Sequence, residues 1–381
     1  MQNNYPSNSR VALYESNKRK RNKKLRLIIG VMMILLLGIG SYIGYIFFRT
    51  KGAIDKTYDP KTAVATNSST FNGKKSFAVL LMGTDTGAFN RTDKMGNTDT
   101  MIVAVVNPSK KRYTLMSIPR DTMAQMVGAK SLTAEKINAA YSIGGAKMAM
   151  NTVSKLINVP IKYYAVINMG GLRKMVNGVG GVTVTPPLSF SYGGYSFKKG
   201  KKTKLNGSQA LAYARMRYDD PTGDYGRQLR QRQVIMSLIE NASSISTLAN
   251  LESILNSVSE NVKTNLSFNN LMAIFQNYKS STATSKSDYL HGLSVTIDGA
   301  SYQVMSDTEL QRVSDYVRSE LGLEKEKISN FETYENKLNE QNGFSFSSTE
   351  DQEYTVYDYG SDTSSDTNSD SDQDNDDTGD Y

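Results

Sequence analysis

The feature that constrains this chain most is an uncharged stretch of 22 residues at 27–48. A helix of about 20 apolar residues crosses the hydrocarbon core of a bilayer. Seven Lys or Arg lie in residues 18–26, and only three lie in residues 49–56. The positive-inside rule then places residues 1–26 in the cytoplasm and the chain after residue 48 outside. We therefore expect a single-pass protein of the cell membrane with a cytoplasmic N-terminus and an extracellular body.

A cleaved secretory signal is the alternative interpretation of the same stretch. The Ala-Val-Ala sequence at 63–65 has the form of a cleavage site, but it lies too far beyond the apolar run. This favours a retained signal-anchor. The chain has no cysteine and one histidine, His291, so disulfides, thiolate chemistry and a multi-histidine metal site are excluded. An extracellular fold of this length must then rely on a packed core.

Charge is distributed very unevenly along the chain. Residues 350–381 hold twelve Asp or Glu and no Lys or Arg, so the net charge of +8 leaves +20 for residues 1–349. A basic body suits an anionic partner such as nucleic acid, anionic lipid or an acidic polymer. Residues 49–75 are polar and predict an extracellular stalk. Residues 326–381 are rich in Ser, Asp and Asn, which predicts a disordered acidic tail.

Between stalk and tail, residues 76–325 show alternating strand and helix patterns that predict one domain. The predicted strands are 76–82, 100–106, 113–118, 163–167 and 182–185, with hairpins at 100–118, 189–197 and 288–306. The predicted helices are 136–157 with an interruption at Gly144-Gly145, 170–176, 207–215 entered from Asn206, 228–241, two within 248–280, and 307–321. This pattern predicts an α/β fold (α+β layered), with a mixed central sheet flanked by helices.

Acidic side chains lie where predicted strands begin or end. Asp85 directly follows the first strand, and Asp99 precedes the next one, so one edge of the sheet can hold both carboxylates. Carboxylate pairs of this kind bind hard cations such as Mg²⁺. The alternative is that both residues cap turns. Arg120 and Asp121 follow Pro119, which ends the third strand and allows Arg120 to point into the same edge.

Two further arginine groups follow the predicted helices. Arg215 and Arg217 face the same way only if the helix ends near them and the chain becomes extended. Arg227 and Gln231 are four residues apart and share one helix face with Arg230, and we expect Asp224 to cap that helix. Arginine forks bind phosphate in bidentate fashion. A solvated charged helix face is the alternative interpretation.

These segments resemble the LytR–CpsA–Psr family of cell-wall phosphotransferases. The resemblance covers about residues 76–245 and rests on six motifs in order: 82–85 (Met-Gly-Thr-Asp), 117–121 (Ser-Ile-Pro-Arg-Asp), 136–141 (Lys-Ile-Asn-Ala-Ala-Tyr), 180–182 (Gly-Gly-Val), 209–217 and 223–231. The resemblance implies an extracellular enzyme that moves a glycopolymer from a polyprenyl-pyrophosphate carrier onto peptidoglycan through a phosphodiester link. It therefore implies three partners, namely the carrier-linked polymer, peptidoglycan and the cell membrane, and no nucleic acid.

The resemblance also assigns roles to residues. Asp85 and Asp99 would bind Mg²⁺ (or Mn²⁺), and a further group would hold the pyrophosphate. That group comprises Arg120, Lys136, Arg215, Arg217, Arg227 and Gln231. Many members have an arginine where this chain has Asn97, and Arg91 from the same loop is the candidate replacement. The catalytic candidates are Arg120 with Asp99 or Asp121, either of which can serve as the base.

Two other classes of function compete with the transferase. A membrane-tethered transcriptional regulator would use the basic N-terminal segment on DNA, but residues 1–26 contain no helix-turn-helix pattern. A non-catalytic module that binds wall polymer or lipid pyrophosphate would need only cations, whereas the pair Asp85 and Asp99 favours metal-assisted chemistry. Hydrolysis of the same donor, with water as acceptor, is not distinguished from transfer by sequence.

Overall fold

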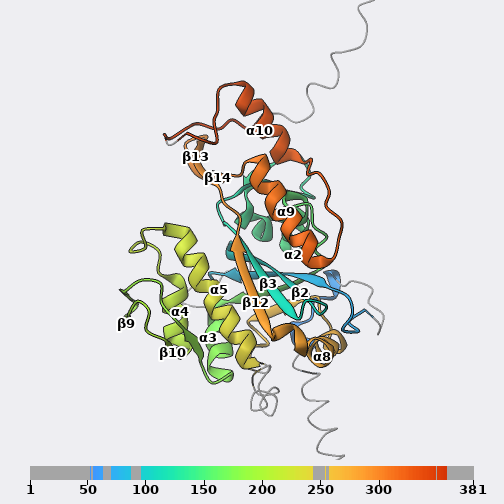
Figure 1. Cartoon of the computed structure of the whole chain (residues 1–381), viewed down its shortest axis with the longest axis vertical. Coiled ribbons are helices and arrows are strands. Elements are labelled where there is room, and N and C mark those ends of the chain that lie inside the picture. Colours follow the sequence, from blue (N-terminus) through green and yellow to red (C-terminus); the bar gives the residue numbers. More distant parts are fainter. Residues whose placement is uncertain are drawn as a thin grey trace, which may run out of the picture.

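The computed structural model describes residues 52, 55–62, 70–86, 96–242, 254, 257–348 and 350–357. The predicted membrane span at 27–48, twelve of the 27 residues of the predicted stalk and residues 358–381 lie outside this part. Within the described ranges, no helix is both long enough and apolar enough to cross a bilayer. The domain is built around one sheet, with helices on both of its faces (Figure 1).

The central sheet has six strands in the order β11-β6-β1-β2-β3-β12. These are β1 (Phe77–Thr84), β2 (Thr98–Asn107), β3 (Arg112–Ile118), β6 (Tyr163–Asn168), β11 (Val262–Thr264) and β12 (Thr284–Tyr289). The β1–β2 and β2–β3 pairs are antiparallel, whereas β6 runs parallel to β1 and β12 runs parallel to β3. The predicted mixed sheet is confirmed, including the hairpin between β2 and β3.

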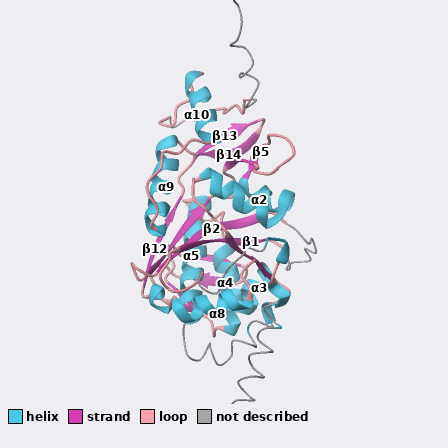
Figure 2. Ribbon diagram, turned by 90° about the vertical axis from the view of Figure 1, so that its right-hand side faces the viewer, coloured by secondary structure: helices cyan, strands magenta, loops and turns pink. Residues whose placement is uncertain are grey.

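Both faces of this sheet are covered, and the strands are apolar on both faces for that reason. On one face Leu80, Val103 and Met116 pack with α2 (Ala140–Leu156) and α9 (Asp307–Leu321). On the other face Ile102 and Leu115 pack against α5 (Gly223–Ala242). Figure 2 shows α2 and α9 on one side of the sheet and α3, α4 and α8 on the other. The core is thus two apolar layers separated by the sheet.

A second block packs beside α5 and carries its own apolar cluster. It contains α3 (Met169–Gly178), α4 (Gly207–Arg215) and the strand pairs β7 (Val182–Val184) with β10 (Thr203–Leu205), and β8 (Phe190–Tyr192) with β9 (Tyr195–Phe197). A capping box between Asn206 and Gln209 starts α4. A Cβ on Gly207 would lie 2.1 Å from the carbonyl oxygen of Arg173, so glycine lets α4 begin directly against α3.

Smaller elements complete the chain. They are η1 (Pro60–Thr62), β4 (Met123–Gln125), β5 (Ala134–Lys136), η2 (Ile137–Ala139), α8 (Phe268–Asn277), η3 (Lys279–Thr282), β13 (Leu293–Ile297), β14 (Ala300–Val304) and α10 (Phe331–Gln341). The predicted break in α2 is confirmed, since Gly145 has a φ of 67°. The predicted hairpin around residue 298 is also confirmed as β13–β14.

The prediction that residues 326–381 are disordered is wrong for their first part. Asn330 closes a capping box at the start of α10. Phe331, Phe344 and Tyr354 are buried together against β13 and β14. Residue 354 is held further by a backbone bond to Thr296. The segment is polar on average, which predicts disorder. Its three buried aromatic residues nevertheless supply the apolar burial that an ordered segment needs.

A carboxyl group is buried in this C-terminal segment. Glu332 on α10 accepts a hydrogen bond from the backbone N–H of Gln125 at 2.9 Å, while its second oxygen has no hydrogen-bond partner. Burial raises the pKa of Glu332 to about 7. Between its ordinary value of 4.5 and that value, the folded chain binds more protons than the unfolded chain. Folding stability attributable to this group therefore falls as the pH rises through this window.

We expect Glu332→Gln to stabilise the fold at pH 8 by roughly 3 kcal/mol relative to the parent chain, and to have little effect near pH 4.5. The amide keeps the acceptor for Gln125 and removes a buried negative charge. Thermal unfolding at both pH values measures the difference. Glu340→Gln, on the exposed side of α10, is the matched control. An equal difference between Glu332→Gln and the parent at both pH values would contradict the burial argument.

Candidate functional site

A β-bulge directs Asp99 at the edge of the central sheet. Gly83 pairs with Thr100 and Thr84 pairs with Thr98, so Asp99 is the extra residue between two strand pairs. A bulge bends its strand and redirects a side chain, and bulges are common beside active sites. Asp85 follows directly where β1 ends and is half-buried. The sequence prediction that both carboxylates lie at one end of β1 and β2 is confirmed.

Arg120 lies against these carboxylates. Its terminal nitrogen donates to Asp99 Oδ1 at 2.5 Å, and its Nε lies 3.4 Å from Asp121 Oδ2. Asp121 also lies 3.6 Å from the Nζ of Lys136 at the end of β5. The backbone N–H of Asn138 donates to the carbonyl of Arg120, which fixes the exit of β3. One chain of ion pairs therefore joins three separate segments of the sequence, those that carry Asp99, Arg120 with Asp121, and Lys136.

Arg227 joins the same cluster from the first turns of α5. It is 7% exposed and paired with Asp224, which also accepts from Gln228 at 2.7 Å. Burial lowers the pKa of Arg227, Asp224 opposes that change, and the positive charges of Arg120 and Arg217 lower the pKa further. Three arginines from separate elements thus contribute positive charge here, and Asp99 and Asp224 offset part of it. A bound anion would offset more of that charge.

The chain leaves α4 as the sequence predicts. The helix ends at Arg215, and Met216 is extended, with φ −55° and ψ 135°. Arg215 and Arg217 are half-buried, and the Arg217 guanidinium lies 5.8 Å from the ring centre of Tyr218. Gln231 is half-buried on α5, one turn after Arg227. Its role in binding pyrophosphate stays a prediction, as do those of the arginines.

The expected start of α5 is wrong. The helix begins at Gly223 instead of residue 228, so Asp224 lies inside its first turn and pairs with side chains instead of capping from outside. The spacing of Arg227, Arg230 and Gln231 along one continuous helix is as predicted, but Arg230 is fully buried and paired with Asp220. A Cβ on Gly226 would lie 1.9 Å from that aspartate's Oδ2, so glycine is required for the pair.

Arg232 is a buried arginine that the sequence motifs did not single out. It is 3% exposed, donates to Ser117 Oγ at 2.7 Å and lies 5.6 Å from the ring centre of Tyr289. Burial lowers its pKa to about 10. Its hydrogen bond to Ser117 connects α5 to the end of β3, three residues before Arg120. Only its position two residues before a run of apolar helix residues distinguishes it in the sequence, which is a weak signal.

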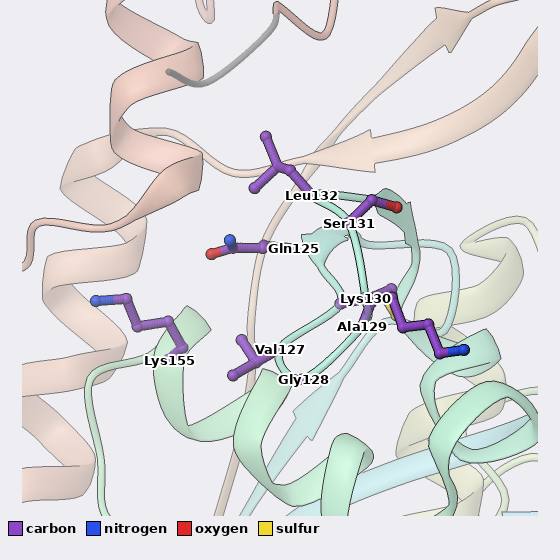
Figure 3. A pocket seen from close by; sticks show the side chains of 9 residues that line it. Gln125, Val127, Gly128, Ala129, Lys130, Ser131, Leu132 and Lys155 are labelled. Carbon is purple, nitrogen blue, oxygen red and sulfur yellow. The ribbon is translucent and has the colours of Figure 1, made fainter. Parts of the chain in front are cut away.

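The loop proposed to supply a replacement arginine lies outside the described residues, Arg91 included. Asn97 is exposed, and its Oδ1 accepts from Ser142 Oγ at 2.9 Å. A cavity of about 280 Å³ lies around the β4–β5 loop. Figure 3 shows its lining side chains, among which Lys130 and Lys155 extend to opposite sides. None of the charged residues of the site lines this cavity. It lies beyond the far end of the hairpin that carries Lys136, so we do not assign it to the site.

The carboxylates fit a magnesium ion in their chemistry. Mg²⁺ in phosphate sites takes one or two protein carboxylates and completes its shell with phosphate oxygens and water. Asp85 and Asp99 can supply the two carboxylates, and Asp99 is one-third exposed. Within the described residues, no group of three or more acidic or histidine side chains forms a complete protein cage. The residues thus suit a metal that a phosphate ligand helps to hold.

The fold and this cluster define an α/β protein with a group of cationic side chains beside two carboxylates at one edge of its central sheet. The LytR_cpsA_psr family pattern matches residues 42–319. The chain therefore belongs to the LytR_cpsA_psr family. The matched range ends before α10.

Relatives match over most of their lengths. A polyisoprenyl-teichoic acid–peptidoglycan teichoic acid transferase TagU from Enterococcus faecalis is 41% identical over 302 residues, 79% of this chain and 98% of that protein. The Bacillus subtilis TagU is 37% identical, over 80% and 99%. The biofilm regulatory protein A of Streptococcus mutans is 36% identical, over 82% and 81%.

Solved structures show the same fold. A protein from Enterococcus faecalis described as a transcriptional regulator matches with a TM-score of 0.62 and 38% identity, covering 74% of this chain and 99% of that one. Bacillus subtilis TagU matches with a TM-score of 0.53 and 36% identity, covering 67% and 100%. TagT bound to LIIa-WTA matches with a TM-score of 0.56 and 26% identity, covering 68% and 94%.

Proposed function

We propose that this protein transfers a glycopolymer from a polyprenyl-pyrophosphate carrier to peptidoglycan, forming a phosphodiester link. The single observation that carries the proposal is the arginine cluster: Arg120 pairs with Asp99, and the buried Arg227, on which the charges of Arg120 and Arg217 act, pairs with Asp224. The names of the relatives, teichoic acid transferases at 37–41% identity, support this donor and acceptor class. We also propose that residues 27–48 anchor the chain, with this site outside the cell.

The chemistry follows from where charge develops. When the acceptor hydroxyl attacks the sugar-linked phosphorus, the bond to the lipid-linked phosphate breaks and negative charge grows on that leaving group. Arg120 and Arg227 are already positioned by their ion pairs, so they stabilise this charge with little reorganisation. The energy of the pyrophosphate bond drives transfer without ATP.

The carboxylates have two proposed roles. Asp85 and Asp99 would hold Mg²⁺ (or Mn²⁺), which when bound neutralises phosphate charge. Asp121 is a better candidate for the base than Asp99, because Asp99 would be engaged in metal binding. Asp121 is held between Arg120 and Lys136 and is about one-quarter exposed. The acceptor proton would pass to its carboxylate as the hydroxyl attacks.

Reconstitution tests the proposal. The full-length chain in nanodiscs receives a polyprenyl-pyrophosphate-linked saccharide and peptidoglycan oligomers, and mass spectrometry detects a phosphodiester-linked product. We expect product with Mg²⁺, loss of product after chelation, and loss of at least about 100-fold in rate for Asp99→Asn. Asp298→Asn, in the distant β13–β14 turn, is the control. Turnover by Asp99→Asn that is equally fast and equally metal-dependent would refute the metal assignment.

The alternatives give different results in the same assay. Released saccharide phosphate without a coupled product would indicate hydrolysis. Tight binding of the donor without turnover would indicate a binding module. A regulator would bind DNA through residues 1–26, and one structural relative carries that description. The arginine cluster lies in the body of the domain, on segments around residues 120 and 227.

A further inference from the structure

One loop of the second block carries a concentrated positive charge that the proposed site does not use. Lys198, Lys199, Lys201, Lys202 and Lys204 fall within seven residues, and all five are exposed. We call this group the lysine loop. None of these lysines takes part in an ion pair among the described residues. Over the 83 residues from 136 to 218, the sequence has thirteen Lys or Arg and no Asp or Glu.

The lysine loop is an ordered segment rather than a free hairpin tip. The backbone N–H of Lys199 donates to Ser189 Oγ at 3.0 Å, and that of Gly200 donates to the Pro186 carbonyl at 2.9 Å. β10, which contains Lys204, pairs with β7. The lysines of a free hairpin tip could move apart, whereas these backbone contacts hold the positive charges of the lysine loop close together. A fixed group of cations with no acidic neighbour in sequence is a surface suited to a polyanion.

The lysine loop is also joined to the proposed site. Phe190 and Phe197, in the hairpin before the loop, pack against the ring of Tyr213 on α4. Arg230 donates to the carbonyls of Tyr213 and Met216, and so fixes the end of α4 from which Arg215 and Arg217 extend. The lysine loop precedes α4 and the two arginines end it. A nine-residue helix is about 14 Å long, so both cationic groups lie on one block within a short distance.

We infer that the lysine loop binds the phosphate-bearing chain of the donor polymer while its pyrophosphate end occupies the arginine cluster. This inference rests on the proposed function and specifies its substrate class, a polyanion rather than a neutral saccharide. A polymer with a phosphate in each repeat can contact several lysines at once, and the resulting binding falls steeply with salt. The contact is remote from the reacting bond, so it lowers KM and leaves kcat unchanged.

Binding of a free polymer tests this without any turnover. The full-length chain in nanodiscs of neutral phosphatidylcholine is titrated with fluorescent poly(glycerol phosphate) that lacks lipid and pyrophosphate, at several salt concentrations. The test variant changes all five lysines of the loop to glutamine. The matched control changes five other exposed lysines to glutamine: Lys162, Lys263, Lys279, Lys286 and Lys327.

We expect the loop variant to bind the polymer at least about tenfold more weakly at low salt. Its slope of log affinity against log salt should fall by up to about 3.5, taking about 0.7 for each lost contact with a flexible polyanion. The control should retain both values. In turnover, the loop variant should show a raised KM for a phosphate-rich donor and an unchanged KM for a neutral one.

Two results would overturn the inference. Polymer affinity equal to that of the control variant would do so directly. Unchanged polymer binding, with lost binding to phosphatidylglycerol vesicles, would assign the loop to the bilayer surface instead. Failure of the proposed transfer leaves the binding result intact, because free polymer is the probe. Unchanged binding of inorganic pyrophosphate by the loop variant verifies that the arginine cluster is still folded.

Discussion

Replacing Arg227 by methionine is expected to reduce transfer by at least about 100-fold, the usual effect of removing one preorganised donor to a developing negative charge. Methionine keeps the length and fills the buried space. The same variant should lose little stability in the absence of ligand, because Asp224, left without its cation, is partly exposed and still accepts from Gln228. Burial lowers the pKa of Arg227, and the positive charges of Arg120 and Arg217 lower it further. Loss of activity without loss of stability is the pattern of a functional, strained site.

Ligand-dependent unfolding separates this from a structural role. A ligand that binds only the folded chain raises stability by about 2.7 kcal/mol at 100 times its dissociation constant. Inorganic pyrophosphate with Mg²⁺ should stabilise the parent in this way and have little effect on Arg227→Met. The control is Arg312→Met, an exposed arginine paired with Glu309 and Asp288, for which we expect normal transfer. Normal turnover by Arg227→Met would remove the central support for the proposed function.

Much of the fold could be predicted because its pattern is local. Asn206 and the apolar spacing after it define α4 to the residue, and Gly144-Gly145 marks the break in α2. β12 was missed for a physical reason. Its sequence, Thr-Ser-Lys-Ser-Asp-Tyr, is polar because it is an edge strand, and it is recruited by parallel pairing with β3. Such long-range pairing leaves little trace in local hydrophobicity.

The site could be predicted only in part, for a similar reason. The motifs place Asp85, Asp99 and Arg120 at one edge of the sheet, and the structure agrees. Helical spacing alone could not distinguish Arg227, which faces the cluster, from Arg230, which is buried in a structural pair. That difference depends on Asp220, ten residues earlier, which a turn brings beside α5. Tertiary contacts, not sequence spacing, decide which arginine is available to a ligand.

The pair of Arg230 and Asp220 gives the largest expected effect on stability. Arg230 is fully buried, and it donates to Asp220 and to the carbonyls of Tyr213 and Met216. Arg230→Met leaves a buried carboxylate without its cation, which costs about 3–5 kcal/mol. Asp220→Asn leaves a buried guanidinium with two carbonyl acceptors and should cost less. Urea unfolding with an unchanged dependence on denaturant measures both.

The double variant decides whether the charges act as a pair. Arg230→Met with Asp220→Asn should lose less stability than the sum of the two single changes, because neither buried charge is then left alone. Since Arg230 fixes the end of α4 to α5, the single Arg230→Met chain should also transfer slowly at temperatures where it remains folded. Strict additivity, or a loss within about 1 kcal/mol for Arg230→Met, would show that the segment before Arg217 is held by apolar packing alone. The arginine cluster would then owe its arrangement to the apolar contacts of Tyr213 and Val234 rather than to the buried ion pair.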